Sequence, residues 1–143
     1  HNRREAGYLA VLLDNGVEPV VRTVDFHTPD SERARLTEAA LDSMPADVDA
    51  VFATDDLTAA AVLEWARKRG HRVPEEFKVV GFDATAAMRR ALPGLTTIQQ
   101  PIDDLALCAV DVLLARAEGV EPHEAESHSP APLPIRLLTG ITT

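Results

Sequence analysis

Acidic residues stand where two apolar segments of this chain end. Asp55 and Asp56 follow the apolar residues 50–53, and Asp83 directly follows residues 78–82. A carboxylate in such a place can accept hydrogen bonds from hydroxyl groups, and its charge strengthens them. In open parallel sheets, ligands bind in the crevice at the carboxyl ends of the strands. The residue types and their positions therefore predict a binding site for a small polar molecule.

No catalytic group accompanies these carboxylates. The serines lie in expected helix ends or in a loop, and neither a glycine-rich phosphate loop nor a Gly-x-Ser-x-Gly motif is present. The five histidines have no metal-ligand spacing. Cys108, the single cysteine, lies among apolar residues in a helical pattern, which favours a small buried side chain. We expect binding without catalysis, and neither a metal nor a cofactor.

The composition is that of one globular domain that does not itself bind DNA. A chain of 143 residues can bury a core, and its hydrophobic fraction of 45% is ordinary. The net charge of −9 opposes nonspecific contact with DNA phosphates, which needs clustered lysine and arginine. No apolar run reaches the length of a membrane-spanning helix.

Helical and extended patterns alternate along the chain. Helices are expected at residues 4–13, 29–43, 57–69, 84–91 and 101–118, and strands at 18–25, 48–53, 78–82, 95–98 and 133–138. Gly16 and Gly70 provide left-handed helix ends, and Asp56 is expected to be the N-cap of the helix after it. This alternation predicts an α/β parallel sheet with right-handed crossovers. Because the chain opens with a helix, we expect the sheet to lack its first strand.

Short motifs follow one another in a recognisable order. They are Asp55-Asp56, Val73-Pro74-Glu75-Glu76, Val79-Val80-Gly81-Phe82-Asp83, Leu95-Thr96-Thr97-Ile98 and Gln100-Pro101, preceded by Arg4-Glu5-Ala6-Gly7-Tyr8 and Asp25-Phe26. Each motif alone is weak, but the ordered set covers nearly the whole chain. It resembles the effector-binding region of LacI/GalR-type bacterial transcription regulators.

The resemblance implies a periplasmic-binding-protein-like, Rossmann-like fold. This is a three-layer parallel sheet with helices on both faces, here without its first central strand. Residues 1–143 are then a fragment of a sugar- or effector-binding domain, with 1–98 mainly its second subdomain. Residues 99–119 form a helix that packs on the first subdomain in intact members, 120–132 a loop, and 133–143 a returning strand and tail. In the family, a helix-turn-helix head, absent here, binds the operator.

The resemblance carries four residues into the ligand cleft: Arg4, Phe26, Asp55 and Asp83. A guanidinium offers a planar fork to oxygens, and an aromatic ring offers a flat apolar face to a sugar or base. Each residue has a structural alternative: a solvated helix start, a core aromatic, a cap and a turn. The family usually has Asn at position 55, so a carboxylate there should favour donor-rich ligands. Gly140 stands where the family often has Arg.

The resemblance also implies a homodimer that pairs through the helix at 57–69. Leu57, Ala61 and Trp65 are the expected interface residues, and a buried core position is the alternative for Trp65. The resulting hypothesis is a cytoplasmic effector sensor for a small polar ligand, most simply a sugar, that binds weakly without the other half of the cleft. A periplasmic-type solute-binding protein is the alternative, and the segment preceding residue 1 in the gene would distinguish them. A receiver-like signalling domain would need its acidic residues in another order.

Overall fold

The computed structural model describes residues 3–25, 27–119 and 132–143. The helices and strands follow one another as α1 (Arg3–Asp14), α2 (Asp30–Asp42), β1 (Ala50–Phe52), α3 (Asp56–Arg69), β2 (Lys78–Asp83), α4 (Ala86–Ala91), β3 (Thr96–Gln99), α5 (Ile102–Ala117) and β4 (Arg136–Leu138). All five expected helices are present, as are four of the five expected strands. Most of the expected loop at 120–132 lies outside the described residues.

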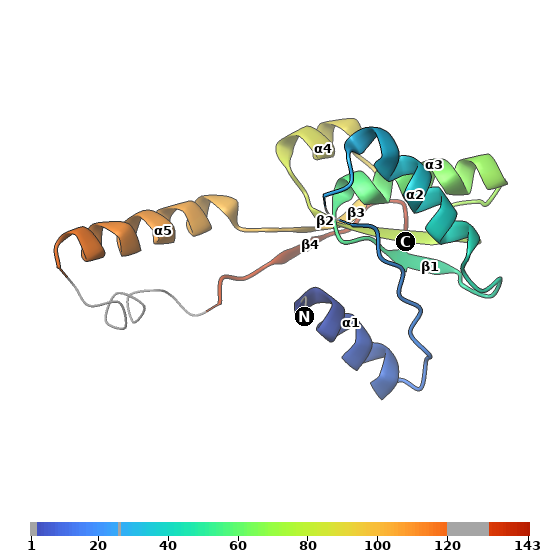
Figure 1. The fold of residues 1–143 in the computed structure, drawn as a ribbon, viewed down its shortest axis with the longest axis horizontal. Coiled ribbons are helices and arrows are strands. Elements are labelled where there is room, and N and C mark those ends of the chain that lie inside the picture. The colour runs from blue at the N-terminus through green and yellow to red at the C-terminus, as the bar shows by residue number, and fades with distance from the viewer. Residues whose placement is uncertain (1–2, 26, 120–131) are drawn as a thin grey trace.

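The four strands form one sheet in the order β1-β2-β3-β4. β1 pairs with β2, and β2 with β3, in parallel, so that Val51 stands opposite Val79 and Phe82 opposite Ile98. The helices α3 and α4 make the crossovers between these parallel strands (Figure 1). β4 returns antiparallel to β3, which makes the sheet mixed rather than wholly parallel. The predicted α/β architecture is confirmed, with one antiparallel strand at the sheet's edge.

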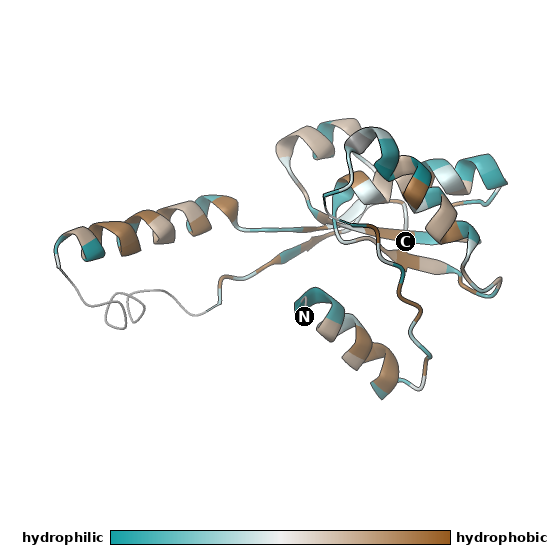
Figure 2. Ribbon diagram, viewed as in Figure 1, coloured by the Kyte–Doolittle hydropathy of each residue, from teal (hydrophilic) through white to brown (hydrophobic). Residues whose placement is uncertain are grey.

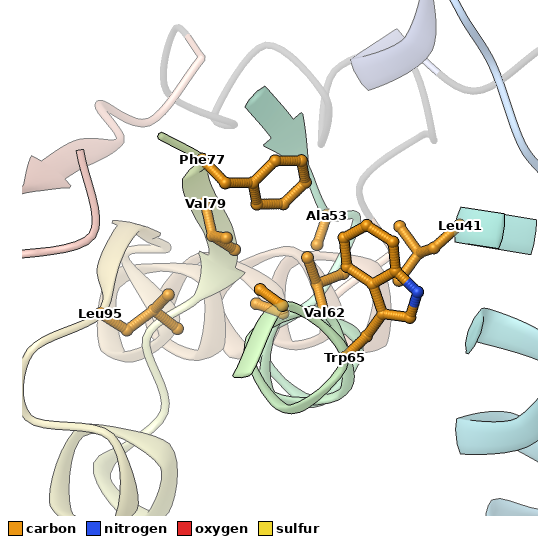
Figure 3. Packing of buried hydrophobic residues seen from close by; sticks show 9 residues of the cluster. Leu41, Ala53, Val62, Trp65, Phe77, Val79 and Leu95 are labelled. Atoms are coloured by element: carbon orange, nitrogen blue, oxygen red, sulfur yellow. The ribbon is translucent and has the colours of Figure 1, made fainter. Parts of the chain in front are cut away.

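The core lies between α3 and the sheet. Helices α2, α3 and α4 lie on one side of the sheet, and α1 lies on the other (Figure 1). Figure 3 shows the buried cluster, in which Val62 of α3, Val79 of β2 and Phe77 come together. α3 ends at Gly70, whose φ of 78° is left-handed, as expected for a glycine helix end. This packing holds the first residues of α3 against the ends of β1 and β2.

Three helices, α1, α4 and α5, bury no residue among those described. Of these, α5 projects away from the sheet at the end of the β3–β4 ribbon (Figure 1). Figure 2 shows how apolar α5 is. Its exposed large apolar residues are Ile102, Leu105, Leu107, Val110, Leu113 and Leu114. The packing of 99–119 on another subdomain remains a prediction. None of the described helices combines the length and apolarity needed to cross a membrane.

The strand expected at residues 18–25 is not formed. Residues 17–25 have no regular secondary structure, although valines and a threonine favour a strand there. A strand exists only where a neighbour accepts and donates its backbone hydrogen bonds, and composition cannot supply that neighbour. Among the described residues, β1 is an edge strand with β2 as its one partner. The segment therefore does not join the sheet.

The C-terminal residues return to the sheet and are held by hydrogen bonds. The Val79 N–H donates to the carbonyl of Thr142 at 2.8 Å, and the Thr142 hydroxyl donates to the Val79 carbonyl at 2.6 Å. The Ile141 N–H donates to the Gly94 carbonyl at 2.8 Å. A Cβ at Gly140 would collide with the backbone of Gly94, within 2.6 Å of its carbonyl carbon. This close approach explains why no larger residue, such as the family's arginine, can stand at position 140 here.

Candidate ligand-binding site

The structure brings two of the predicted carboxylates to one opening. β1 and β2 are parallel neighbours, so Asp55, three residues after β1, and Asp83, the last residue of β2, come out at the same edge of the sheet. Both residues line a cavity of about 300 Å³. The other lining residues are Arg33, Asp56, Leu57, Thr85 and Met88. The cavity therefore has an acidic side with an apolar contribution from two side chains.

Asp55 is the N-cap of α3. Its Oδ1 accepts a hydrogen bond from the Thr58 N–H at 2.7 Å, and its Oδ2 accepts one from the Thr58 hydroxyl at 3.0 Å. The N-cap predicted at Asp56 is therefore wrong by one residue. The backbone explains the difference, because Asp55 is extended at φ −154° while Asp56 is already helical. Carboxylate oxygens have several acceptor sites, so capping does not prevent Asp55 from binding a ligand.

Asp83 stands on a turn with left-handed backbone. The backbone φ of Asp83 is 110° and that of Ala84 is 51°, values that residues other than glycine rarely adopt. Its Oδ1 accepts a hydrogen bond from the Gln100 amide at 2.5 Å. Within the described parts of the chain, no protein group donates to its Oδ2. The Asp83 carboxylate thus lines the cavity and is tied through Oδ1 to the segment that leads into α5.

Arg4 joins the same end of the sheet from α1. Its guanidinium donates a hydrogen bond to the Thr54 carbonyl, next to Asp55. It also lies over the Phe82 ring, 4.5 Å from the ring centroid, where the ring's negative face attracts a cation. Arg4 is therefore close to both acidic turns but does not line the cavity. Phe26, the fourth predicted ligand residue, lies outside the described residues.

Asp56 has a position that the sequence analysis missed. It is 2% exposed, and it accepts hydrogen bonds from the Ala84 N–H at 2.8 Å and the Thr97 hydroxyl at 2.5 Å. These bonds join the start of α3 to the turn after β2 and to β3. The sequence contains one signal for it. Of two successive carboxylates at a helix start, one caps the helix and the other is available for a different role.

The residues expected at a dimer interface lie in different environments. Leu57 is 50% exposed on α3, and Ala61 is half-buried. Trp65 is 8% exposed and belongs to the core, where its indole N–H donates to Asp42 Oδ1 at 2.8 Å. Trp65 also stacks on His71, with ring centroids 5.2 Å apart. The buried alternative thus describes Trp65, and Leu57 is the apolar residue that α3 leaves exposed.

A larger cavity of about 600 Å³ lies beside α4, β3 and β4. Three arginines line it, Arg89, Arg90 and Arg136. We place the ligand site in the smaller cavity because that one lies at the carboxyl ends of adjacent parallel strands, where such sheets bind ligands. No group of histidine, cysteine, aspartate and glutamate within the described ranges could hold a metal ion.

The resolved pKa shifts belong to surface ion pairs outside both cavities. A hydrogen bond from Arg67 lowers the pKa of Glu64, and one from Arg72 lowers the pKa of Glu76. Both carboxyls lie at the surface, so these pairs contribute to the charge pattern of the surface and not to the chemistry of the site.

Comparison with known proteins identifies the fold. A family model for the periplasmic binding protein-like domain matches residues 1–143. The chain belongs to this family. It is 34% identical over 142 residues to the sucrose operon repressor of Pediococcus pentosaceus, covering 99% of this chain and 42% of that protein.

Solved structures agree with the family assignment. A complex of the transcriptional regulator CelR with cellobiose has a TM-score of 0.75 at 30% identity, covering 98% of this chain and 42% of that one. A LacI-family regulatory protein from Corynebacterium glutamicum has a TM-score of 0.74 at 28% identity, covering 98% and 52%. The resemblance to LacI-type regulators and the predicted fold are therefore confirmed. These relatives are named as a repressor and as transcription regulators, and the chain spans about half their length or less.

Proposed function

We propose that this chain forms one wall of a sugar-binding cleft in a LacI-type transcription regulator. The observation that carries the proposal is the shared cavity, which Asp55 and Asp83 line at the ends of neighbouring parallel strands. Arg4 is held at the same end by its bond to the Thr54 carbonyl. The site thus combines charged hydrogen-bond acceptors with a nearby guanidinium.

The chemistry of the cavity fits a polyhydroxylated ligand. Carboxylates only accept hydrogen bonds and sugar hydroxyls donate them, so Asp55 and Asp83 suit hydroxyl pairs. Leu57 and Met88 add apolar surface that can meet the carbon face of a sugar ring. The matched CelR structure contains cellobiose, and one relative is named a sucrose operon repressor. These names favour a sugar effector, and a regulator over a solute-binding protein.

The proposed mechanism couples cleft closure to DNA binding. The opposite wall of the cleft comes from the part of such a regulator that lies outside the matched segment, and a helix-turn-helix head contacts the operator in the cytoplasm. A ligand changes operator affinity only if it binds the DNA-competent and DNA-incompetent states with different affinities. With a single wall, the 143-residue chain should bind a sugar weakly.

Calorimetric titration with cellobiose and sucrose tests the proposal. The wild-type chain should bind one of them with a Kd on the order of millimolar. Asp83→Asn should abolish detectable heat, because a hydrogen bond to a charged group contributes about 1.5–3 kcal/mol. Asp47→Asn removes an exposed carboxylate in the turn before β1 and should leave binding unchanged. Equal binding by Asp83→Asn and wild type would overturn the proposed site. Nanomolar binding by the wild-type chain would overturn the proposal that it supplies only one wall of the cleft.

A further inference from the structure

Among the residues that the structure describes, the buried carboxylate of Asp56 has no cationic partner. The described ion pairs involve Glu38, Asp42, Glu64 and Glu76, and all of them lie at the surface. Taking a carboxylate out of water is costly unless hydrogen bonds or an opposite charge compensate it. Here the compensation comes from two donors, the Ala84 N–H and the Thr97 hydroxyl. These two bonds compensate the burial of Asp56 and tie it to the turn after β2 and to β3.

The neighbouring sequence makes room for this carboxylate. A Cβ at Gly81 would run into Asp56 Oδ1 and would also come within 3.0 Å of Leu95 Cδ2. Gly81 has ordinary strand geometry in β2, so the need for glycine here is space and not a left-handed backbone. Thr97 lies opposite Gly81 in the parallel pairing of β2 and β3, which brings its hydroxyl to the same place. Asp56, Gly81 and Thr97 therefore form one packed unit.

The Ala84 hydrogen bond falls on the strained turn. Asp83 and Ala84 both have positive φ, and non-glycine residues stay in that region only where surrounding contacts hold them there. The Ala84 N–H is buried and bonds to Asp56 Oδ2. Asp56 thus bonds to the backbone of the turn from α3, beside the pairing of Asp83 with Gln99 of β3. Releasing it would let the turn relax towards negative φ and re-aim the Asp83 side chain.

We propose that Asp56 is a positioning residue whose buried carboxylate holds the left-handed Asp83–Ala84 turn and so aims Asp83 into the ligand cavity. Its consequence for sugar binding rests on the proposed function, whereas its effect on the turn does not. Asp56 acts through its hydrogen bond from the Ala84 N–H, and this role requires no contact with the ligand. Asp55 and Asp56 then have different roles, because Asp55 is offered to the ligand while Asp56 holds the turn that carries Asp83.

Amide hydrogen exchange on the 15N-labelled chain tests the effect on the turn without any ligand. Asp56→Ala should speed exchange at Ala84 about 10- to 100-fold beyond the change in global stability, the range for a hydrogen bond to a charged group. Val62→Ala is the matched control, because it destabilises the core from the same helix without touching the turn. Asp56→Asn keeps an acceptor oxygen for Ala84 and an amide donor for Thr97, so exchange at Ala84 should stay near that of the control.

The same samples report the backbone φ of Asp83 and Ala84. The HN–Hα couplings of Asp83 and Ala84 should change in Asp56→Ala and persist in Val62→Ala. If Asp56→Ala does not fold, Gly81→Ala displaces the carboxylate instead and should speed exchange at Ala84 in the same way. Exchange at Ala84 that follows only global stability, with unchanged couplings, would overturn the proposal.

Cellobiose titration then separates the two claims. Asp56→Ala should lose binding as Asp83→Asn does, while Val62→Ala keeps it, and retained binding in Asp56→Ala would overturn the positioning role. A wild-type chain that binds neither cellobiose nor sucrose defeats the proposed function. The exchange result would still support or overturn the hold of Asp56 on the turn.

Discussion

Replacing Gly140 with alanine tests how tightly the C-terminal segment closes on the sheet. The added Cβ would lie 2.6 Å from the Gly94 carbonyl carbon and 2.8 Å from that of Leu95. Both are backbone atoms, which cannot rotate away. If the segment moves, the bonds from the Gly140 N–H to the Thr96 hydroxyl and from the Ile141 N–H to the Gly94 carbonyl are lost. Two such bonds contribute about 2 kcal/mol, and accepting the overlap costs about 1–3 kcal/mol.

Either route predicts a loss of about 2 kcal/mol in the free energy of unfolding. With a urea m-value of about 2 kcal/mol per molar, the midpoint should fall by about 1 M. Trp65 is the single tryptophan, it is buried, and its fluorescence reports the transition. Gly7→Ala is the control, since nothing lies within 4 Å of its added Cβ and alanine suits a helix. A Gly140→Ala chain that unfolds at the wild-type midpoint would refute the close approach of the two backbone segments.

Three further changes have definite outcomes. Asp42→Ala removes the acceptor of the Trp65 indole, so unfolding free energy should fall by about 1 kcal/mol and Trp emission should shift to longer wavelength; an unchanged spectrum would contradict that bond. Arg72 lowers the pKa of Glu76 below its usual 4.5, so the pair's stabilisation is present above that pH and is lost as pH falls through the lowered value. Glu76→Gln should therefore flatten the pH dependence of the unfolding midpoint below 4.5, and superimposable profiles would disprove it. Leu57→Glu should weaken the predicted homodimer in sedimentation equilibrium, and a wild-type chain that stays monomeric at high concentration would exclude that interface.

Local signals explain what could be predicted from the sequence. Gly70 ends α3 because the backbone there is left-handed, a conformation that glycine adopts without a Cβ clash. A single glycine in the sequence is enough to predict this helix end. The apolar runs of β1 and β2 end in carboxylates, and their parallel pairing brings Asp55 and Asp83 to one cavity. Periodicity and helix-end residues carry this information within a few positions, so no tertiary structure is needed to read it.

Features that depend on distant partners could not be read in that way. Residues 18–25 have strand composition but no strand neighbour. β4 is antiparallel, and nothing in its short apolar pattern encodes direction. Asp56 and Asp55 are chemically identical and adjacent, and only the placement of Ala84 and Thr97 decides which of them is buried. The side-chain pattern of one segment gives no information about the donors that another segment brings to it.

Residue-resolved NMR titration with cellobiose tests the central claim most directly, because the chain has two cavities in different places. The account predicts that the amide signals of Asp55, Asp83 and Ala84 shift with one shared saturation curve, since Asp55 and Asp83 line the smaller cavity and Ala84 directly follows Asp83. Shifts confined to Arg89, Arg90 and Arg136, which line the larger cavity, would contradict it.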